Sequence, residues 1–288
     1  MNGSIHPGAS LGAIYLTIKD LGRSLDYYQN RLGFRLIRRE ADNVYLGVAD
    51  HVLVVLHEDP AASTSLYTTG LYHFAIRVPT RLELAQSLKH IADTKTQVQG
   101  FADHLVSEAI YLSDPDGIGI ELYRDRPRDE WQYVNGQLKM ATDPLDIDGI
   151  LSELNHHTEG WAGLHSATRM GHIHLRVAQI SPAETFYRDV IGYDLILRYG
   201  PMASFLSAGG YHHHIGINTW AGVGLPAPQD HSTGLRWFTI QCHGEEDLTR
   251  TFNRVSNAGI PLQKYADGWL VRDPSSNGVL LTAGNDSQ

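Results

Sequence analysis

Three residues in the middle of the chain are of types that bind metals, namely His73, Glu121 and His172. Imidazole nitrogens and carboxylate oxygens together form common ligand sets of metalloenzymes. The three residues fall in the middle two of four sequence repeats, at positions that correspond from repeat to repeat. The corresponding residues of the first and fourth repeats are Ala13, Val55, Trp237 and Leu280, none of which binds a metal. Potential metal ligands at these positions are therefore confined to the second and third repeats.

The repeats are visible as pairs of similar segments. Leu32-Gly33-Phe34 corresponds to Ile191-Gly192-Tyr193, and Asp114-Pro115 corresponds to Asp273-Pro274, in both cases 159 residues later. The run Gly-Leu-Tyr-His-Phe at 70–74 likewise corresponds to Gly-Leu-Arg-Trp-Phe at 234–238. Such self-similarity indicates duplicated supersecondary units, so matching residues are expected at matching places in the fold.

Each repeat has the hydrophobic pattern of one strand, one helix and three further strands. In the second repeat, alternating apolar residues predict a strand over 72–78, and apolar residues at helical spacing predict a helix through Leu84, Leu88 and Ile91. Strands over 109–112 and 118–123 then flank a turn that contains Pro115 and Gly117. Four such βαβββ modules predict an α+β protein with two curved mixed sheets.

The repeats also predict the domain boundaries. Repeats one and two give an N-terminal domain over 1–126, and repeats three and four give a C-terminal domain over 169–288. Residues 127–168 interrupt the pattern and are expected to form a linker with a short helix over 146–154.

Composition excludes several classes of function. The 288 residues carry a formal net charge of −9, which argues against nucleic acid or an anionic membrane as a partner. A single cysteine rules out an intrachain disulfide and suits a reducing compartment. The N-terminal residues lack a signal-peptide pattern, and no apolar run approaches the ~20 residues that span a bilayer. These features predict a cytoplasmic protein.

Four segments of repeats two and three carry a family resemblance. They are Gly70-Leu71-Tyr72-His73-Phe74-Ala75-Ile76, the run 103–123 that includes Asp114-Pro115-Asp116-Gly117, Gly171-His172-Ile173-His174-Leu175, and Gly210-Tyr211-His212-His213-His214-Ile215-Gly216. In these segments the chain resembles the vicinal oxygen chelate (glyoxalase/bleomycin resistance/extradiol dioxygenase) superfamily. Within that superfamily it is similar to two-domain extradiol enzymes of the catechol 2,3-dioxygenase type, over nearly the whole chain.

The resemblance implies a metal site made by His73, His172 and Glu121. In extradiol enzymes the two histidines come from the first strands of paired repeats and the glutamate from a last strand. Well-known members pair the third repeat with the fourth, whereas the complete ligand set here requires pairing of the second with the third. The metal site is therefore expected between those two repeats. Such a set leaves three adjacent positions on Fe(II), enough for a bidentate catecholate and O2, and it also accepts Mn(II).

The resemblance further implies catalytic residues around the metal. His214 corresponds to the histidine that exchanges a proton with the substrate hydroxyl, and a pKa of about 6.5 suits an imidazole to that task at neutral pH. Its neighbour His213 is the alternative. Tyr111 corresponds to the tyrosine that hydrogen-bonds a ring oxygen, and His104 to a further active-site histidine.

Several aromatic residues are expected near the same site. His174 follows His172 by two residues, so both side chains face the same side of a strand, and His174 is expected to line the cavity. Three loop tryptophans are candidates for the wall of an aromatic substrate site: Trp131, Trp161 and Trp220.

Together these features predict an Fe(II)-dependent extradiol dioxygenase that cleaves catechol or a substituted catechol. Both atoms of O2 would enter a 2-hydroxymuconate semialdehyde-type product. The expected partners are a small aromatic diol and O2, and the resemblance makes a homo-oligomer a possible assembly. Two alternatives from the same superfamily are a metal-dependent glyoxalase-type lyase or isomerase and a non-catalytic small-molecule-binding protein of the resistance type. Metal binding separates the last of these from the other two.

Overall fold

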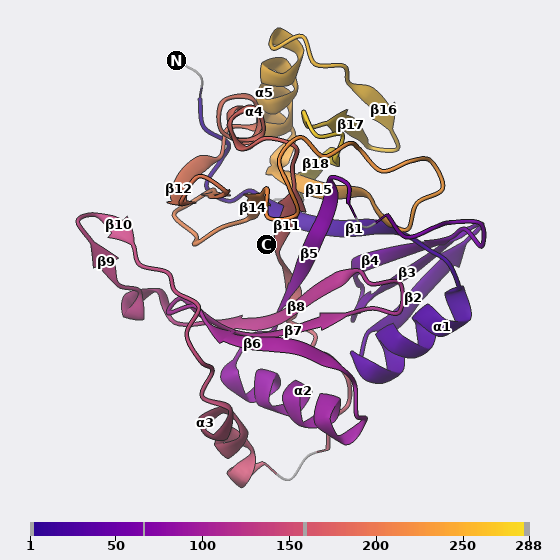
Figure 1. Cartoon of the computed structure of the whole chain (residues 1–288), viewed down its shortest axis with the longest axis vertical. Helices are drawn as coiled ribbons and strands as arrows, with labels where there is room; N and C mark the ends of the chain where they lie inside the picture. The colour runs from indigo at the N-terminus through magenta and orange to yellow at the C-terminus, as the bar shows by residue number, and fades with distance from the viewer. Residues whose placement is uncertain (1–2, 66, 158–159, 285–288) are drawn as a thin grey trace. The chain divides into compact units, whose positions relative to one another are not determined.

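The computed structural model describes residues 3–65, 67–157 and 160–284 (Figure 1). The described chain divides into two compact units, each built from separate segments. Unit 1 comprises Met1–Leu16, Ser63–Tyr72 and His172–Gln288, and unit 2 comprises Thr17–Ala62 and His73–Gly171. The domain boundaries expected from the repeats, with a linker over 127–168, stay a prediction.

The element order follows the four repeats. The strands are β1 (Ser10–Ile18), β2 (Arg35–Glu40), β3 (Asn43–Val48), β4 (His51–Glu58), β5 (Gly70–Arg77), β6 (Val98–Asp103), β7 (Ser107–Ser113), β8 (Gly119–Asp125), β9 (Tyr133–Val134), β10 (Gln137–Leu138), β11 (Arg169–Arg176), β12 (Asp194–Tyr199), β13 (Ala203–Ser207), β14 (Ile215–Asn218), β15 (Gly234–His243), β16 (Gln263–Tyr265), β17 (Gly268–Arg272) and β18 (Gly278–Gly284). The helices are α1 (Leu21–Leu25), α2 (Arg81–Asp93), α3 (Ile147–Ser152), α4 (Ile180–Thr185) and α5 (Gly244–Asn257). Helices α1 and α4 each continue into a π-helical turn, over Asp26–Arg31 and Phe186–Ile191, and short 3₁₀ turns occupy Arg128–Glu130 and Glu153–His156.

The long strands form two eight-stranded mixed sheets. Their strand orders are β12-β13-β14-β11-β5-β8-β7-β6 and β16-β17-β18-β15-β1-β4-β3-β2. In the second, third and fourth repeats the last strand pairs in parallel with the first: β8 with β5, β14 with β11 and β18 with β15. The α+β architecture of βαβββ modules in two mixed sheets is thus confirmed, as is the short helix expected over 146–154, which is α3.

Within unit 2, helix α2 lies along strands β6–β8 (Figure 1). The Thr80 hydroxyl caps the helix by accepting a hydrogen bond from the backbone N–H of Leu82. The apolar residues spaced for a helix, Leu84, Leu88 and Ile91, are buried. Burial of this stripe against the sheet fixes β5 and β8, the strands that carry His73 and Glu121.

Within unit 1, helix α5 has the same relation to β15 and β18 (Figure 1). Its first turn carries Glu245, Glu246 and Asp247, whose charges suit a helix N-terminus. No helix among the described residues is long and apolar enough to cross a membrane.

The Asp-Pro turns of the repeats make the same contacts in both units. Asp114 Oδ1 accepts the N–H groups of Asp116 and Ile118, and its Oδ2 accepts the Tyr28 hydroxyl at 3.1 Å. Asp273 does the same with Ser275, Asn277 and the Tyr187 hydroxyl. Desolvation is the largest influence on Asp114 and raises the pKa of its carboxyl from 3.8 to about 6. The structural equivalence of these turns supports the repeat assignment made from sequence.

Replacing Asp114 with asparagine is expected to change the pH dependence of stability. Because its pKa is higher in the folded state, the folded protein binds this proton more tightly, and the contribution of Asp114 to stability falls as pH rises from 3.8 to about 6. Asparagine does not ionise, so the stability of Asp114→Asn relative to the wild type should rise across that window, by about 3 kcal/mol at most. Urea unfolding at several pH values measures this. A difference independent of pH, or the same trend in the exposed turn variant Asp42→Asn, would contradict it.

A second buried acid, Glu108 of β7, holds three arginines of unit 2. Glu108 is fully buried, and its carboxylate lies 2.6 Å from Arg124 Nε, 3.0 Å from Arg81 Nε and 3.3 Å from Arg126 Nη2. Arg81 is the first residue of α2, and Arg124 lies on β8. The cluster therefore ties the start of the helix to the strand that carries Glu121.

Removing the Glu108 charge should be strongly destabilising. Glu108→Gln would leave Arg124, itself buried, without its counter-charge, which costs about 3–5 kcal/mol in comparable buried pairs. The free energy of unfolding in urea measures the loss. Asp93→Asn is the matched control, because its 2.7 Å pair with Lys89 is exposed and should contribute only about 0.2–1 kcal/mol. Equal losses in the two variants would contradict the assigned role of the cluster.

Candidate metal centre

His73 and Glu121 are brought together by the parallel pairing of β5 with β8. The register pairs His73 with Gly119 and Ala75 with Glu121, so the histidine and the glutamate are diagonal neighbours on one face. Gly119, opposite His73, has no side chain to separate them. His73 Nε2 consequently lies 3.1 Å from Glu121 Oε2.

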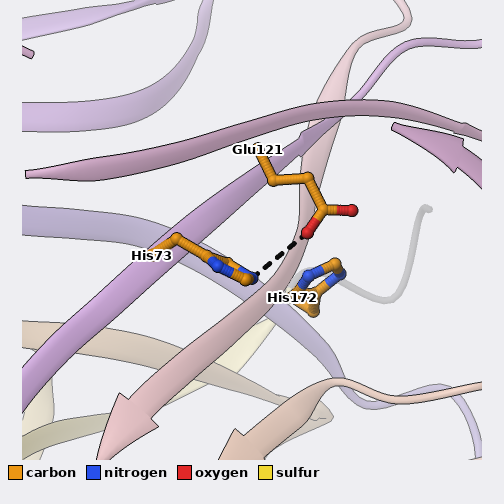
Figure 2. Close-up of side chains that lie close together, drawn as sticks. All are labelled: His73, Glu121 and His172. Carbon is orange, nitrogen blue, oxygen red and sulfur yellow. Dashed lines mark ion pairs between the residues drawn. The ribbon is translucent and has the colours of Figure 1, made fainter. Parts of the chain in front are cut away.

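His172 of β11 completes a group of three potential metal ligands. One ligand atom from each of His73, Glu121 and His172 lies within 4.8 Å of the others, and all three residues are buried. Figure 2 shows the three side chains pointing toward a common space, with the dashed line joining His73 to Glu121. Two neutral nitrogen donors and one carboxylate oxygen fit a divalent transition metal that keeps open positions. A bound cation would also compensate the charge of a carboxylate that is costly to bury.

Tyr111 belongs to the same hairpin as Glu121. Strands β7 and β8 pair Tyr111 directly with Glu121, which explains their spacing of ten residues along the chain. The ring of Tyr111 lies 5.7 Å from the ring of His73. The tyrosine expected near the metal from the sequence is therefore a neighbour of two of the potential ligands.

His104 contacts Tyr111 and fixes its hydroxyl. His104 Nε2 lies 2.6 Å from the Tyr111 hydroxyl, and Nδ1 lies 2.6 Å from the carbonyl oxygen of Ala141. A carbonyl can only accept, so Nδ1 carries a proton, and in a neutral ring Nε2 accepts the Tyr111 O–H. The His104 ring therefore holds the Tyr111 hydroxyl in one orientation.

The structure places the ring of His213 beside that of His172. The ring centroids of His213 and His172 are 4.0 Å apart, and His213 Nδ1 lies 2.7 Å from Nδ1 of the fully buried His212. His214 instead accepts the N–H of Ala208 at Nδ1, 3.2 Å away. The resemblance favoured His214 for proton exchange, with His213 as the alternative, and the choice between them stays a prediction.

The change of face has a local cause. Strict alternation back from Gly216 in β14 would put His214 on the inner face. The register with β13 starts at Ile215, and His214 just before it donates its N–H to the Leu206 carbonyl. The preceding segment leaves a turn at Gly209 and Gly210, both with φ near +60°. In the sequence, the adjacent pair Gly209-Gly210 indicates a turn, so the alternation of side chains in β14 cannot be extended back through it.

Of the three loop tryptophans, Trp220 alone has a contact with a residue of this region among those described. Its ring lies 5.1 Å from that of His174. Trp131 Nε1 donates to the carbonyl oxygen of Arg126, and Trp161 stacks on His90 at 3.4 Å, so both pack inside unit 2. A role for Trp131 and Trp161 in the wall of a substrate site stays a prediction.

Comparison with known proteins identifies the protein family to which the chain is similar. The family model described as Glyoxalase/Bleomycin resistance protein/Dioxygenase superfamily matches residues 10–122 and 169–277. The chain is 41% identical to "Catechol-2,3-dioxygenase" of Bacillus subtilis (strain 168) over 283 residues, covering 96% of this chain and 98% of that protein. It is 27% identical to a "Lactoylglutathione lyase" of Neisseria meningitidis over 124 residues, which covers 40% of this chain and 90% of the lyase.

Solved structures agree on the fold. A putative dioxygenase from Bacillus subtilis superposes with a TM-score of 0.69 at 12% identity, covering 99% of this chain and 86% of that one. Glyoxalase I from Zea mays superposes with a TM-score of 0.58 at 14% identity, covering 96% and 92%. Similarity at these identities concerns the arrangement of the βαβββ modules alone.

Proposed function

The chain belongs to the Glyoxalase/Bleomycin resistance protein/Dioxygenase superfamily, and we propose that it is an Fe(II)-dependent extradiol dioxygenase acting on a catechol. The chain is an enzyme, because it is similar to a catechol-2,3-dioxygenase along nearly its full length. The product would be a ring-opened 2-hydroxymuconate semialdehyde-type compound that contains both atoms of O2.

One observation carries the proposal, the buried group of two histidines and one glutamate. Together, His73, His172 and Glu121 would hold the metal through two nitrogens and one oxygen. Fe(II), when bound there, supplies adjacent open positions at which a bidentate diol and O2 meet, and Mn(II) accepts the same ligands. Burial of all three residues excludes bulk water from the ligand side of the site.

His213 would exchange a proton with the diol. A catechol has to lose a hydroxyl proton to bind as an anion, and the proton has to return to an oxygen later in the reaction. Nδ1 of His213 is engaged with His212, so Nε2 is the atom that would take up and return this proton. The short contact with His212 also fixes the orientation of the ring.

Tyr111 would orient the substrate from the side of β7. With its O–H donated to His104, the Tyr111 oxygen presents a lone pair that can accept a hydrogen bond from a substrate hydroxyl. The pair His104–Tyr111 thus holds an acceptor in a fixed position near His73. Loss of His104 should affect turnover only through the tyrosine.

The main alternative is a metal-dependent lyase or isomerase of the glyoxalase type. The partial likeness to a lactoylglutathione lyase and the shared fold favour it. A lyase needs no O2 and opens no aromatic ring, so the two reactions are separated by their products.

The deciding experiment is anaerobic purification and metal analysis by mass spectrometry, followed by addition of Fe(II), catechol and air. About one iron per chain, O2 uptake and a yellow ring-fission product are expected. Metal without product or O2 uptake from catechol or substituted catechols would favour the lyase, tested next with a glutathione hemithioacetal. Failure to bind any divalent metal would contradict the proposal and favour the non-catalytic binding protein.

A further inference from the structure

A continuous row of aromatic rings in unit 1 runs from His172 to the protein surface. Ring centroids are separated by 4.0 Å from His172 to His213, 4.9 Å from His213 to Phe205 and 5.6 Å from Phe205 to His174. The row continues from His174 to Trp220 at 5.1 Å and from Trp220 to Tyr72 at 5.3 Å. We call these rings, from His213 to Tyr72, the aromatic wall.

The two ends of the aromatic wall differ in exposure. His213 and His174 are buried, whereas Trp220 is 42% exposed and Tyr72 is 43% exposed. Gly216 makes room for the middle of the wall, because a Cβ at this position would lie 2.9 Å from the His174 ring. Large exposed aromatic residues that touch each other and continue into a candidate site are suited to contact a ligand with a flat apolar part.

Arg176 lies at the outer end of the aromatic wall. It follows His172 and His174 on β11 at positions two apart, so the three side chains leave the same face of the strand. Its Cα is about 13 Å from that of His172 along the strand, at about 3.3 Å per residue. Its Nη2 donates to the carbonyl oxygen of Leu71, the residue before Tyr72, at 2.7 Å.

Arg176 has no acidic partner among the residues that the structure describes. The Leu71 carbonyl accepts one of its five N–H donors, and its buried Nε has no hydrogen-bond partner in the described structure. Partial burial lowers the pKa of the guanidinium, as expected for a cation that lacks a counter-charge. In unit 2, by contrast, Arg81 and Arg124 each form an ion pair with Glu108. A half-buried guanidinium with unused donors suits a carboxylate, which it can bind with two parallel hydrogen bonds.

We propose that the aromatic wall and Arg176 select catechols with a flat unsaturated side chain that ends in a carboxylate. The diol would lie at the His172 end, the side chain would pass Phe205, His174 and Trp220, and the carboxylate would meet Arg176. This inference rests on the proposed function and names the substrate class for that site. Recognition of the carboxylate should appear mainly in KM, because the contact is made equally in substrate and transition state.

The test uses three diols with the full-length, iron-loaded protein: catechol, 3,4-dihydroxycinnamate and the methyl ester of that acid. The ester has the same flat side chain without the charge. Because a hydrogen bond between charged groups stabilises the bound acid, kcat/KM for the acid should exceed that for the ester by roughly tenfold to a hundredfold. Arg176→Met, which keeps the apolar stem, should bring this ratio close to one. Arg169→Met is the matched control, because Arg169 lies on the same strand and donates to the carbonyl oxygens of Ser166 and Thr168. Its ratio should match that of the wild type.

Equal use of acid and ester by the wild type would overturn the inference, as would an unchanged ratio in Arg176→Met. If that variant does not fold, Arg176→Lys decides. A lysine keeps the charge but not the planar fork, so a ratio reduced several-fold supports the inference and an unchanged ratio contradicts it. Cleavage of catechol without preference for the acid would leave the proposed function standing, whereas no cleavage of any of the three diols would contradict the proposed function itself.

Discussion

His73→Ala is expected to lose both the metal and the dioxygenase activity. The variant removes one of two nitrogen donors from a group whose ligand atoms lie within 4.8 Å of one another, and alanine offers no replacement. The remaining histidine and glutamate form a bidentate site, which binds a divalent metal far more weakly than three ligands do. Metal content by mass spectrometry after anaerobic loading and desalting should fall to a small fraction of the wild-type value. Turnover of catechol should fall below detection.

The control for this prediction is His51→Ala. His51 is also a strand histidine of unit 2, but it lies at the start of β4 beside the exposed Asp50. This variant should keep the metal and the activity of the wild type. Circular dichroism and a thermal melt establish that His73→Ala is folded. Iron bound at full stoichiometry in a folded His73→Ala would show that the assigned ligand set is wrong.

His213→Gln is expected to keep the metal but lose most of its turnover. The side chain lies next to His172, and its role in the proposed reaction is to take up and return a substrate proton. Loss of a general acid–base group typically lowers kcat by about 10²- to 10⁴-fold. Iron content should stay at the wild-type value, since His213 is not one of the three ligands. The limb of the kcat–pH profile that belongs to the histidine should also disappear.

His214→Gln is the matched comparison, one residue away. Its ring packs against Tyr193 and Tyr211, and its Nδ1 accepts from the Ala208 backbone. This variant should lose some stability, while iron content and the pH profile of turnover stay close to those of the wild type. The opposite result, with turnover lost in His214→Gln and kept in His213→Gln, would restore the assignment that the family resemblance favoured.

The sequence alone was enough to predict the architecture and the convergence of the three potential ligands. Repetition carries this information, because duplicated units place corresponding residues at corresponding points of a strand. The family resemblance, carried by the motifs of repeats two and three, supplied Tyr111 and the ligand set, and the β7–β8 hairpin pairs Tyr111 with Glu121. These features depend on local periodicity and on backbone pairing, both of which are written in the chain as simple patterns.

Only the tertiary structure decided which histidine of 212–214 lies beside His172. These residues precede β14, and its strand hydrogen bonds already include His214, whose N–H donates to the Leu206 carbonyl and whose carbonyl accepts from Ile173. The side-chain directions in this segment depend on contacts with β13 and on the turn at Gly209. The isolation of Arg176 was equally hidden, since its bonded carbonyl, Leu71, lies 105 residues away. Whether a charged side chain has a counter-charge depends on every group that the fold places around it. No periodic pattern in the sequence predicts those neighbours. The sequence therefore determined the scaffold and the ligand types, and the packing of distant segments decided the direction and the charge environment of the residues around them.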